Sequence, residues 1–370
     1  MRPETPIPAD VLAAIRAPFA AAGATPTDAP VLQPLALLLD LAGEAMRSRL
    51  FVVQGDGGEE AALRPDFTIP IARAHIDSGA ASGRYFYEGK AFRVAPQGSG
   101  RAEEFLQIGL EAYGGTDAIA DDAEVAALAW AAAKAGGRKD LSLLLGDVGL
   151  FAAFVDSLSL EPALAGRLKR SFSRPRLLKA ELEGRPSQGA EASRIAALLA
   201  GLEEPEAVEV LEELWTLAGI EPVGGRSAVE IAHRLVERSH AAEGARLTSA
   251  EAEKVRAFLT ISDAPEKALD AIGKLSGGMT AALEGWSKRL KAMVERGADP
   301  KAMRLSTGFG RAFGYYDGML FEVRSAALGD DQPVAAGGRY NSLPERLGGK
   351  ATTAVGCMVR PGRAFAGAEQ

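Results

Sequence analysis

Strand-forming segments lie at both ends of the chain, and a long block of helix-forming sequence separates them. Short apolar runs and turn signals fill residues 49–145 and return after residue 303, whereas residues 151–296 are rich in Ala, Leu, Glu and Arg at helical spacing. We therefore expect an α+β fold with a mostly antiparallel sheet flanked by helices. Residues 1–150 and 301–370 would form its core, and residues 151–300 a helical insertion.

Local signals assign the individual elements. Gly55–Gly58 between two apolar runs are typical of a β-hairpin. Aspartates from Asp117 onward, before an Ala-rich run that ends at Gly136-Gly137, predict a helix. The predicted helices cover residues 11–22 and 117–135, and the predicted strands cover residues 49–53, 60–64, 85–94, 104–112, 141–145, 318–323, 334–336 and 352–359.

Composition limits the possible functions. The 370 residues carry a formal net charge of −7, which disfavours a protein whose whole surface binds nucleic acid. Cys357 is the only cysteine, so an internal disulfide and a Cys-rich zinc site are excluded. Its apolar neighbours predict an inert, buried strand residue. Residues 1–6 lack the apolar region of a secretory signal, and the apolar run of residues 31–41 is too short to cross a bilayer. We expect a soluble, cytoplasmic protein without a membrane contact.

Two further patterns have simple structural explanations. Gly308-Phe309-Gly310-Arg311 follows a predicted strand, but Asp317-Gly318 predicts a hairpin where a dinucleotide-binding loop needs a helix. The three histidines form no plausible metal cluster, so we predict no transition-metal site. We expect His75 to pack inside the fold and His233 and His240 to lie on a solvated helix face.

Several motifs at the two ends of the chain together resemble the catalytic core of a histidyl-tRNA synthetase, a class II aminoacyl-tRNA synthetase. The most specific is motif 2, in which a strand ending in Phe-Arg leads through a loop to a strand with Gln-x-Gly-x-Glu. Phe92-Arg93, the loop of residues 94–104 and Gln107–Glu111 reproduce that order. The other matching segments are Leu63–Thr68, Arg311–Gly318, Ala336–Tyr340 and Arg363. The resemblance implies the class II synthetase fold.

The resemblance also implies a histidine-binding pocket. Its residues would be Asp66, Thr68, Gln107 and Arg311 at the amino and carboxylate end, and Glu111, Tyr315 and Tyr316 at the imidazole ring. These side chains suit the ligand, because an ammonium group needs carboxylate or hydroxyl acceptors and an imidazole needs an acid or a phenol. The family has a glutamate at Asp66, so the pocket would be looser by one methylene. Alternatively, Gln107 and Glu111 lie on a solvated strand face, and the two tyrosines only pack in the sheet.

The nucleotide half of the resemblance is weaker. Arg93 and Arg363 match arginines that bind phosphate, and they would retain residual anion binding. Around them, residues that the family uses for ATP are replaced. Ala95 and Gly314 occupy positions where the family has acids. Residues Arg101–Glu104 replace a cationic and aromatic loop. Residues Arg360-Pro361-Gly362 replace the family residues before the motif 3 arginine. We expect no cofactor, no metal and no catalytic residue.

The resemblance extends to a regulatory protein built on the synthetase fold. Only residues 364–370 follow motif 3, so we expect no anticodon-binding domain and no tRNA partner. A histidine pocket beside a damaged nucleotide site resembles the regulatory subunit of ATP phosphoribosyltransferase. This family implies a homodimer, contacting through the region around Pro30, that joins the short-form catalytic subunit in a hetero-octamer. It would activate the first step of histidine biosynthesis and mediate feedback by L-histidine.

Three alternatives remain open from the sequence. A truncated but active histidyl-tRNA synthetase, or a paralogue that activates an amino acid for another acceptor, needs a working ATP site, which Ala95 disfavours. A scaffold that binds no ligand is disfavoured because Thr68, Gln107, Glu111 and Tyr315 occur together.

Overall fold

The structure is a computed structural model that describes residues 4, 6–42, 44–56, 58–184, 202, 204–218, 246–310 and 314–369. Within these residues the chain forms two compact units, one of residues 1–154 with 258–370 and one of residues 155–257. The predicted core and insertion boundaries, 150 and 301, therefore differ from those of the compact units, and helices near residues 265–295 belong to the first unit. The histidine predictions for His233 and His240 lie outside the described residues.

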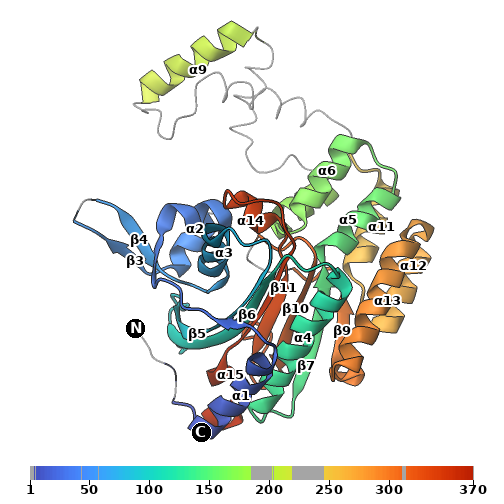
Figure 1. Cartoon of the computed structure of the whole chain (residues 1–370). Helices are drawn as coiled ribbons and strands as arrows, with labels where there is room; N and C mark the ends of the chain where they lie inside the picture. Colours follow the sequence, from blue (N-terminus) through green and yellow to red (C-terminus); the bar gives the residue numbers. More distant parts are fainter. Residues whose placement is uncertain are drawn as a thin grey trace. The chain divides into compact units, whose positions relative to one another are not determined.

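The first unit is built on a large sheet (Figure 1). Among the described residues it has nine strands in the order β1-β5-β6-β12-β11-β10-β7-β9-β8. Adjacent strands pair antiparallel except β1 with β5 and β7 with β9, which pair parallel. The strands are β1 Thr25–Pro26, β5 Gly83–Phe92, β6 Glu104–Tyr113, β7 Leu141–Asp147, β8 Ser262–Asp263, β9 Met303–Ser306, β10 Met319–Ser325, β11 Ala335–Arg339 and β12 Ala354–Val359.

A second, small sheet contains the predicted hairpin. Strand β4 (Glu60–Leu63) pairs antiparallel with β2 (Leu32–Pro34) on one side and with β3 (Val52–Gln54) on the other. The helices of the first unit are α1 Ala9–Ala21, α2 Leu35–Ala42, α3 Thr68–Ser78, α4 Ala118–Ala135, α12 Pro265–Leu275, α13 Thr280–Glu295, α14 Ser342–Arg346 and α15 Pro361–Ala364. Short 3-10 helices are η1 Glu44–Arg49, η2 Gly277–Met279, η3 Pro300–Ala302 and η4 Ala366–Glu369.

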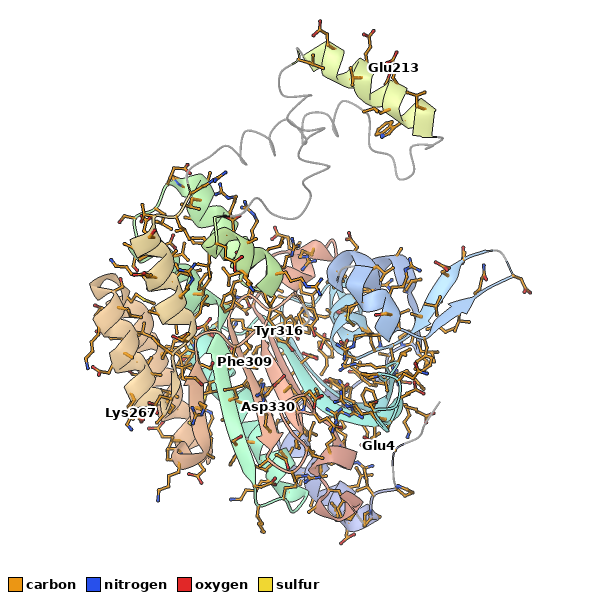
Figure 2. All side chains as sticks on the ribbon, turned by 180° about the vertical axis from the view of Figure 1, so that it is seen from behind. Glu4, Glu213, Lys267, Phe309, Tyr316 and Asp330 are labelled. Carbon is orange, nitrogen blue, oxygen red and sulfur yellow. The ribbon has the colours of Figure 1, made fainter. Side chains whose placement is uncertain are left out.

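Helices α1 and α4 lie on one face of the large sheet, and α3 packs on β6 at the other face. Side chains lie between these helices and the sheet (Figure 2). Alternation along β5 shows this, because successive strand residues point to opposite faces. Phe86 packs toward Phe19 of α1, with ring centroids 6.4 Å apart. Its neighbour Tyr85 instead lies against His75 of α3, whose Nδ1 is 2.9 Å from the tyrosine hydroxyl. His75 is buried, so its predicted packing role is confirmed.

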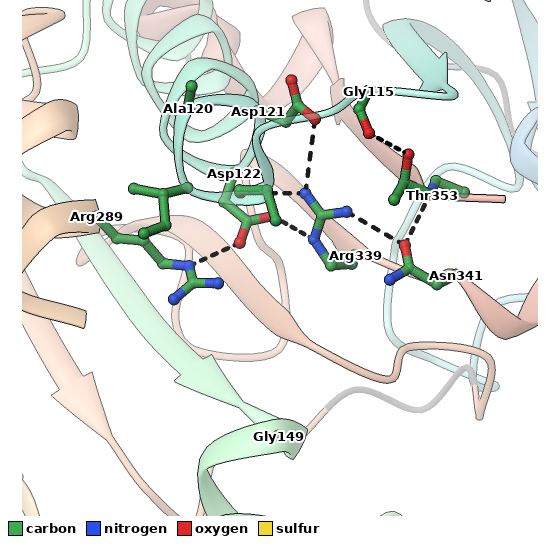
Figure 3. A network of polar contacts seen from close by, with 12 residues as sticks. Gly115, Ala120, Asp121, Asp122, Gly149, Arg289, Arg339, Asn341 and Thr353 are labelled. Atoms are coloured by element: carbon green, nitrogen blue, oxygen red, sulfur yellow. Dashed lines mark hydrogen bonds and ion pairs between the residues drawn. The ribbon is translucent and has the colours of Figure 1, made fainter. Parts of the chain in front are cut away.

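Helix α4 is fixed to the sheet by buried polar groups as well as by its alanine face. Its N-cap Asp117 accepts hydrogen bonds from the backbone N–H groups of Ile119 and Ala120, as helix N-caps commonly do. One turn later, Asp122 lies between Arg339 of β11 and Arg289 of α13, with N–O distances of 2.8 Å to each (Figure 3). Arg339 also donates to Asn341 Oδ1 at 3.2 Å. This network joins three elements that are far apart in the sequence.

The second unit is helical in its described part. It contains α6 (Pro162–Ser171), α7 (Pro175–Leu182) and α9 (Glu204–Ala218), together with most of α11 (Ser249–Leu259) and the C-terminal end of α5 (Val148–Ser157). Helices α6 and α7 pack together, and Arg167 and Glu181 form an ion pair of 3.3 Å between them.

One predicted turn is wrong. Asp317-Gly318 does not close a hairpin, because β9 and β10 do not pair with each other but lie on either side of β7. The Asp317 carboxylate instead accepts hydrogen bonds from the backbone N–H groups of Asn341, at 3.0 Å, and Ser342, at 2.6 Å. It therefore holds the chain where β11 leads into α14. A strand, not a helix, follows this segment, which agrees with the exclusion of a dinucleotide-binding loop.

Candidate functional site

Strand β6 carries the polar residues of the candidate site on one face. Gln107 and Glu111 are both 1 % exposed, so a solvated strand face is excluded for them. The Glu111 carboxylate accepts a hydrogen bond from the hydroxyl of Thr68 at 2.8 Å and a short one from the hydroxyl of Tyr340. Gly356 faces Glu111 on the neighbouring β12. A Cβ atom at Gly356 would lie 1.6 Å from Glu111 Oε2, so this carboxylate position requires glycine there.

The charge of Glu111 is not compensated by a cation in the described part of the chain, because no ion pair to it occurs there. The pKa of Glu111 is raised to about 8, mainly because the group is buried and in smaller part because Asp66 is near. Hydrogen bonds from Tyr340 and Thr68 lower it. A carboxyl group that is desolvated and held only by hydroxyl groups is a favourable place for an incoming cation, which would stabilise the ionised form.

Gln107 and Asp66 lie beside Glu111. Gln107 donates through Nε2 to the hydroxyl of Tyr87 at 3.2 Å, and its buried Oε1 has no hydrogen-bond partner among the described residues. Tyr87 stacks on Phe67, with ring centroids 4.5 Å apart and an interplanar angle of 10°. Asp66 is 4 % exposed and directly precedes this phenylalanine. Three of the four residues predicted at the amino and carboxylate end, Asp66, Thr68 and Gln107, thus lie together with Glu111.

Aromatic rings complete the cluster. Tyr315 is buried, and its ring centroid lies 4.7 Å from that of Tyr316. Both rings meet Tyr340 edge-on, at 5.8 Å and 79° for Tyr315 and at 6.2 Å and 80° for Tyr316. Tyr340 therefore joins the two predicted tyrosines to Glu111. The seven residues Asp66, Thr68, Gln107, Glu111, Tyr315, Tyr316 and Tyr340 are called the Glu111 cluster below.

The sequence prediction missed one residue of the cluster, and another predicted residue is not tested. Tyr340, which donates to Glu111, was not among the predicted site residues. The sequence contains a signal for its position. Neighbouring residues of an extended chain point to opposite faces, so Tyr340 lies on the face opposite to Arg339, which pairs with Asp122. The predicted Arg311 lies outside the described residues, so its place near the carboxylate stays a prediction.

The predicted phosphate-binding residues Arg93 and Arg363 lie near each other, together with Arg360. Burial and the positive charges of Arg360 and Arg93 lower the pKa of Arg363 to about 8. Arg93 Nε donates to the carbonyl of Pro65 at 2.8 Å, and Arg363 Nη1 donates to the carbonyl of Pro333 at 3.0 Å. The three residues Arg93, Arg360 and Arg363 are called the arginine cluster below.

Metal binding has no support in the described residues, which contain no group of three or more His, Cys, Asp or Glu side chains able to hold a metal ion. Within the same residues, no helix combines the length and the apolar character needed to cross a bilayer.

Comparisons with known proteins agree with this geometry. The family model described as histidyl-tRNA synthetase matches residues 8–237 and 226–362. An ATP phosphoribosyltransferase regulatory subunit from Brucella ovis is 34% identical over 361 residues, which cover 95% of this chain and 93% of that protein. A protein of the same name from Brucella suis is similar to the same extent. The chain belongs to the ATP phosphoribosyltransferase regulatory subunit family.

Solved structures support the fold of this family. A Bacillus halodurans protein described as an ATP phosphoribosyltransferase regulatory subunit/histidyl-tRNA synthetase aligns with a TM-score of 0.63 and 20% identity, over 96% of this chain and 78% of that one. Histidyl-tRNA synthetase from Nostoc aligns with a TM-score of 0.60 and 16% identity, over 96% of this chain and 70% of that one. The predicted class II synthetase-like fold and the predicted family, one of regulatory subunits and not of enzymes, are confirmed.

Proposed function

We propose that this chain acts in the cytoplasm as the non-catalytic regulatory subunit of an ATP phosphoribosyltransferase and that L-histidine binds in the Glu111 cluster. It would join the short-form catalytic subunit, activate the first step of histidine biosynthesis and carry feedback inhibition. The observation that supports histidine binding is a buried carboxyl group, Glu111, that two hydroxyl groups hold and no described cation neutralises.

Histidine offers the charges that this cluster lacks. Its ammonium group and its imidazole N–H are donors, and Glu111, Asp66 and the buried Oε1 of Gln107 are acceptors. A cation beside Glu111 would lower the pKa of that carboxyl group from about 8 and create a charge-assisted hydrogen bond. Tyr315 and Tyr316 provide aromatic surface for the ring.

The nucleotide half supports a non-catalytic role. Adenylate formation needs arginines that are available to the phosphates of ATP. Here Arg93 and Arg363 donate to backbone carbonyls of their own chain, and Arg360 forms an ion pair with Glu4. These contacts use part of the hydrogen-bonding capacity that ATP would need, which disfavours an active truncated synthetase or another amino-acid-activating enzyme.

Regulation requires that histidine bind with different affinity to two states of the assembled complex, since a ligand with equal affinity for both states does not shift their equilibrium.

We propose a homodimer as the core of a hetero-octamer. Support for the dimer comes from exposed apolar side chains beside and within the small sheet, namely Val31, Leu32, Val52 and Val53.

Calorimetric titration of histidine tests the proposal, with the chain alone and with a short-form catalytic subunit. Glu111→Ala should weaken binding by about ten- to a hundredfold, because a lost charged hydrogen bond at a buried site costs about 1.5–3 kcal/mol. Arg93→Ala serves as the comparison and should weaken histidine binding much less, because its side chain donates to the carbonyl of Pro65 beside the cluster and its counterpart in the family binds phosphate. Unchanged binding by Glu111→Ala would place the histidine sensor elsewhere.

A second measurement addresses catalysis. The isolated chain should not support histidine-dependent exchange between ATP and pyrophosphate. Exchange at about 1 per second or faster, a rate typical of enzymes, would favour the amino-acid-activating alternatives.

A further inference from the structure

Glu4 reaches into the arginine cluster from the N-terminal segment. Its carboxylate pairs with Arg360 at 3.1 Å, and the two side chains are only 12 % and 6 % exposed. Figure 2 shows the labelled Glu4 side chain beside the sheet and apart from the labelled Tyr316. Glu4 therefore forms a buried ion pair with Arg360, which lies 356 positions later in the sequence.

The surroundings of Glu4 fit a carboxylate closely. Its Oε2 accepts a hydrogen bond from the backbone N–H of Leu106 at 3.0 Å, on the part of β6 that lies beyond the end of β12. Gly362 leaves the space for it, since a Cβ atom there would lie 2.4 Å from Glu4 Cδ. The position thus has a backbone donor, a guanidinium partner and a cavity that any other residue at Gly362 would fill.

Electrostatics favour an anion at this position. Arg360 stacks on Phe105, with its Cζ 3.6 Å from the ring centroid, and Arg93 Cζ is 5.6 Å from the same centroid. Guanidinium groups held together in a buried place repel one another unless an anion lies between them. Glu4 opposes this repulsion, because it raises the pKa of both Arg360 and Arg363.

We propose that the Glu4 carboxylate is the resident occupant of the arginine cluster, where the sequence predicts residual anion binding, and that it keeps this site closed. An anion of the phosphate class must displace Glu4 to bind. The N-terminal segment then detaches from the edge of β6. This inference goes beyond the regulatory role proposed above and does not depend on it.

Binding of inorganic pyrophosphate to the full chain tests the proposal by calorimetry. Glu4→Gln keeps the size of the side chain but removes its charge, so pyrophosphate should bind at least about tenfold more tightly than to the wild type. Glu59→Gln, at an exposed acid, is the matched control and should behave like the wild type. The double change Glu4→Gln with Arg363→Gln should lose the gain. Equal affinities of wild type and Glu4→Gln, or no binding by either, would overturn the proposal.

Proteolysis of the wild type gives a second test that does not depend on the folding of a variant. A glutamyl endopeptidase cleaves after Glu4 only when this side chain leaves the cluster. Saturating pyrophosphate should accelerate the loss of residues 1–4, followed by mass spectrometry, at least severalfold. Cleavage after the exposed Glu59 and Glu60 should not change. If pyrophosphate leaves cleavage after Glu4 unchanged, Glu4 is not its competitor and the proposal fails.

Discussion

Two buried carboxyl groups of the first unit, Glu111 and Asp122, have opposite surroundings. Asp122 is completely buried between Arg289 and Arg339, and these arginines oppose the rise in pKa that burial causes. Glu111 is equally inaccessible, but its partners are hydroxyl groups, and its pKa rises to about 8. The two arginines neutralise the charge of Asp122, and this network holds the fold together (Figure 3). A carboxyl group that has no cation beside it among the described residues is instead available to a ligand.

The largest expected effect tests the structural side of this comparison. Asp122→Ala should lower the free energy of unfolding by about 3–5 kcal/mol, because it leaves two arginines without their buried partner. Urea unfolding followed by circular dichroism measures this change. The control is Asp270→Asn, which removes an exposed i, i+4 pair with Lys274 and should cost about 0.5 kcal/mol or less. Similar losses for both variants would show that the network in Figure 3 contributes little stability.

A smaller effect concerns the proton on Glu111. In the unfolded chain its pKa is near 4.5, and in the folded chain it is about 8. Between these values the folded state holds a proton that the unfolded state has released. The free energy of unfolding should therefore fall as pH rises through this window, by up to about 1.4 kcal/mol for each pH unit.

Glu111→Gln isolates this contribution, because glutamine does not titrate. Urea unfolding of wild type and variant at pH 5, 6.5 and 8 should give a difference in stability that shifts against the wild type as pH increases. A difference that stays constant over this range would mean that Glu111 keeps an ordinary pKa and that a cation neutralises it.

The sequence predicts local elements well and distant contacts poorly. Strands β5 and β6 and helix α4 lie within a few residues of their predicted bounds, because alternation, capping and glycine signals are local. The parallel pairing of β7 with β9 has no local signal, which is why a hairpin was expected instead. The motif resemblance identified most of the Glu111 cluster. It did not predict that Tyr340 donates to Glu111, 229 positions away, or that Glu4 occupies the arginine cluster.

The smallest expected effect sharpens the comparison from within the Glu111 cluster. Thr68→Val keeps the shape of the side chain but removes the hydrogen bond that Glu111 Oε1 accepts at 2.8 Å. A lost hydrogen bond of this kind costs about 1 kcal/mol of stability. Because the Thr68 hydroxyl lowers the pKa of Glu111, its removal should raise that pKa above its wild-type value. The pH window in which stability falls should then extend to higher pH, as measured by the same urea titrations.

The control is Thr307→Val, which removes another buried hydroxyl that donates only to backbone carbonyls. It should leave the pH window unchanged. If Thr68→Val leaves it unchanged too, the Thr68 hydroxyl does not lower the pKa of Glu111 and contributes packing alone.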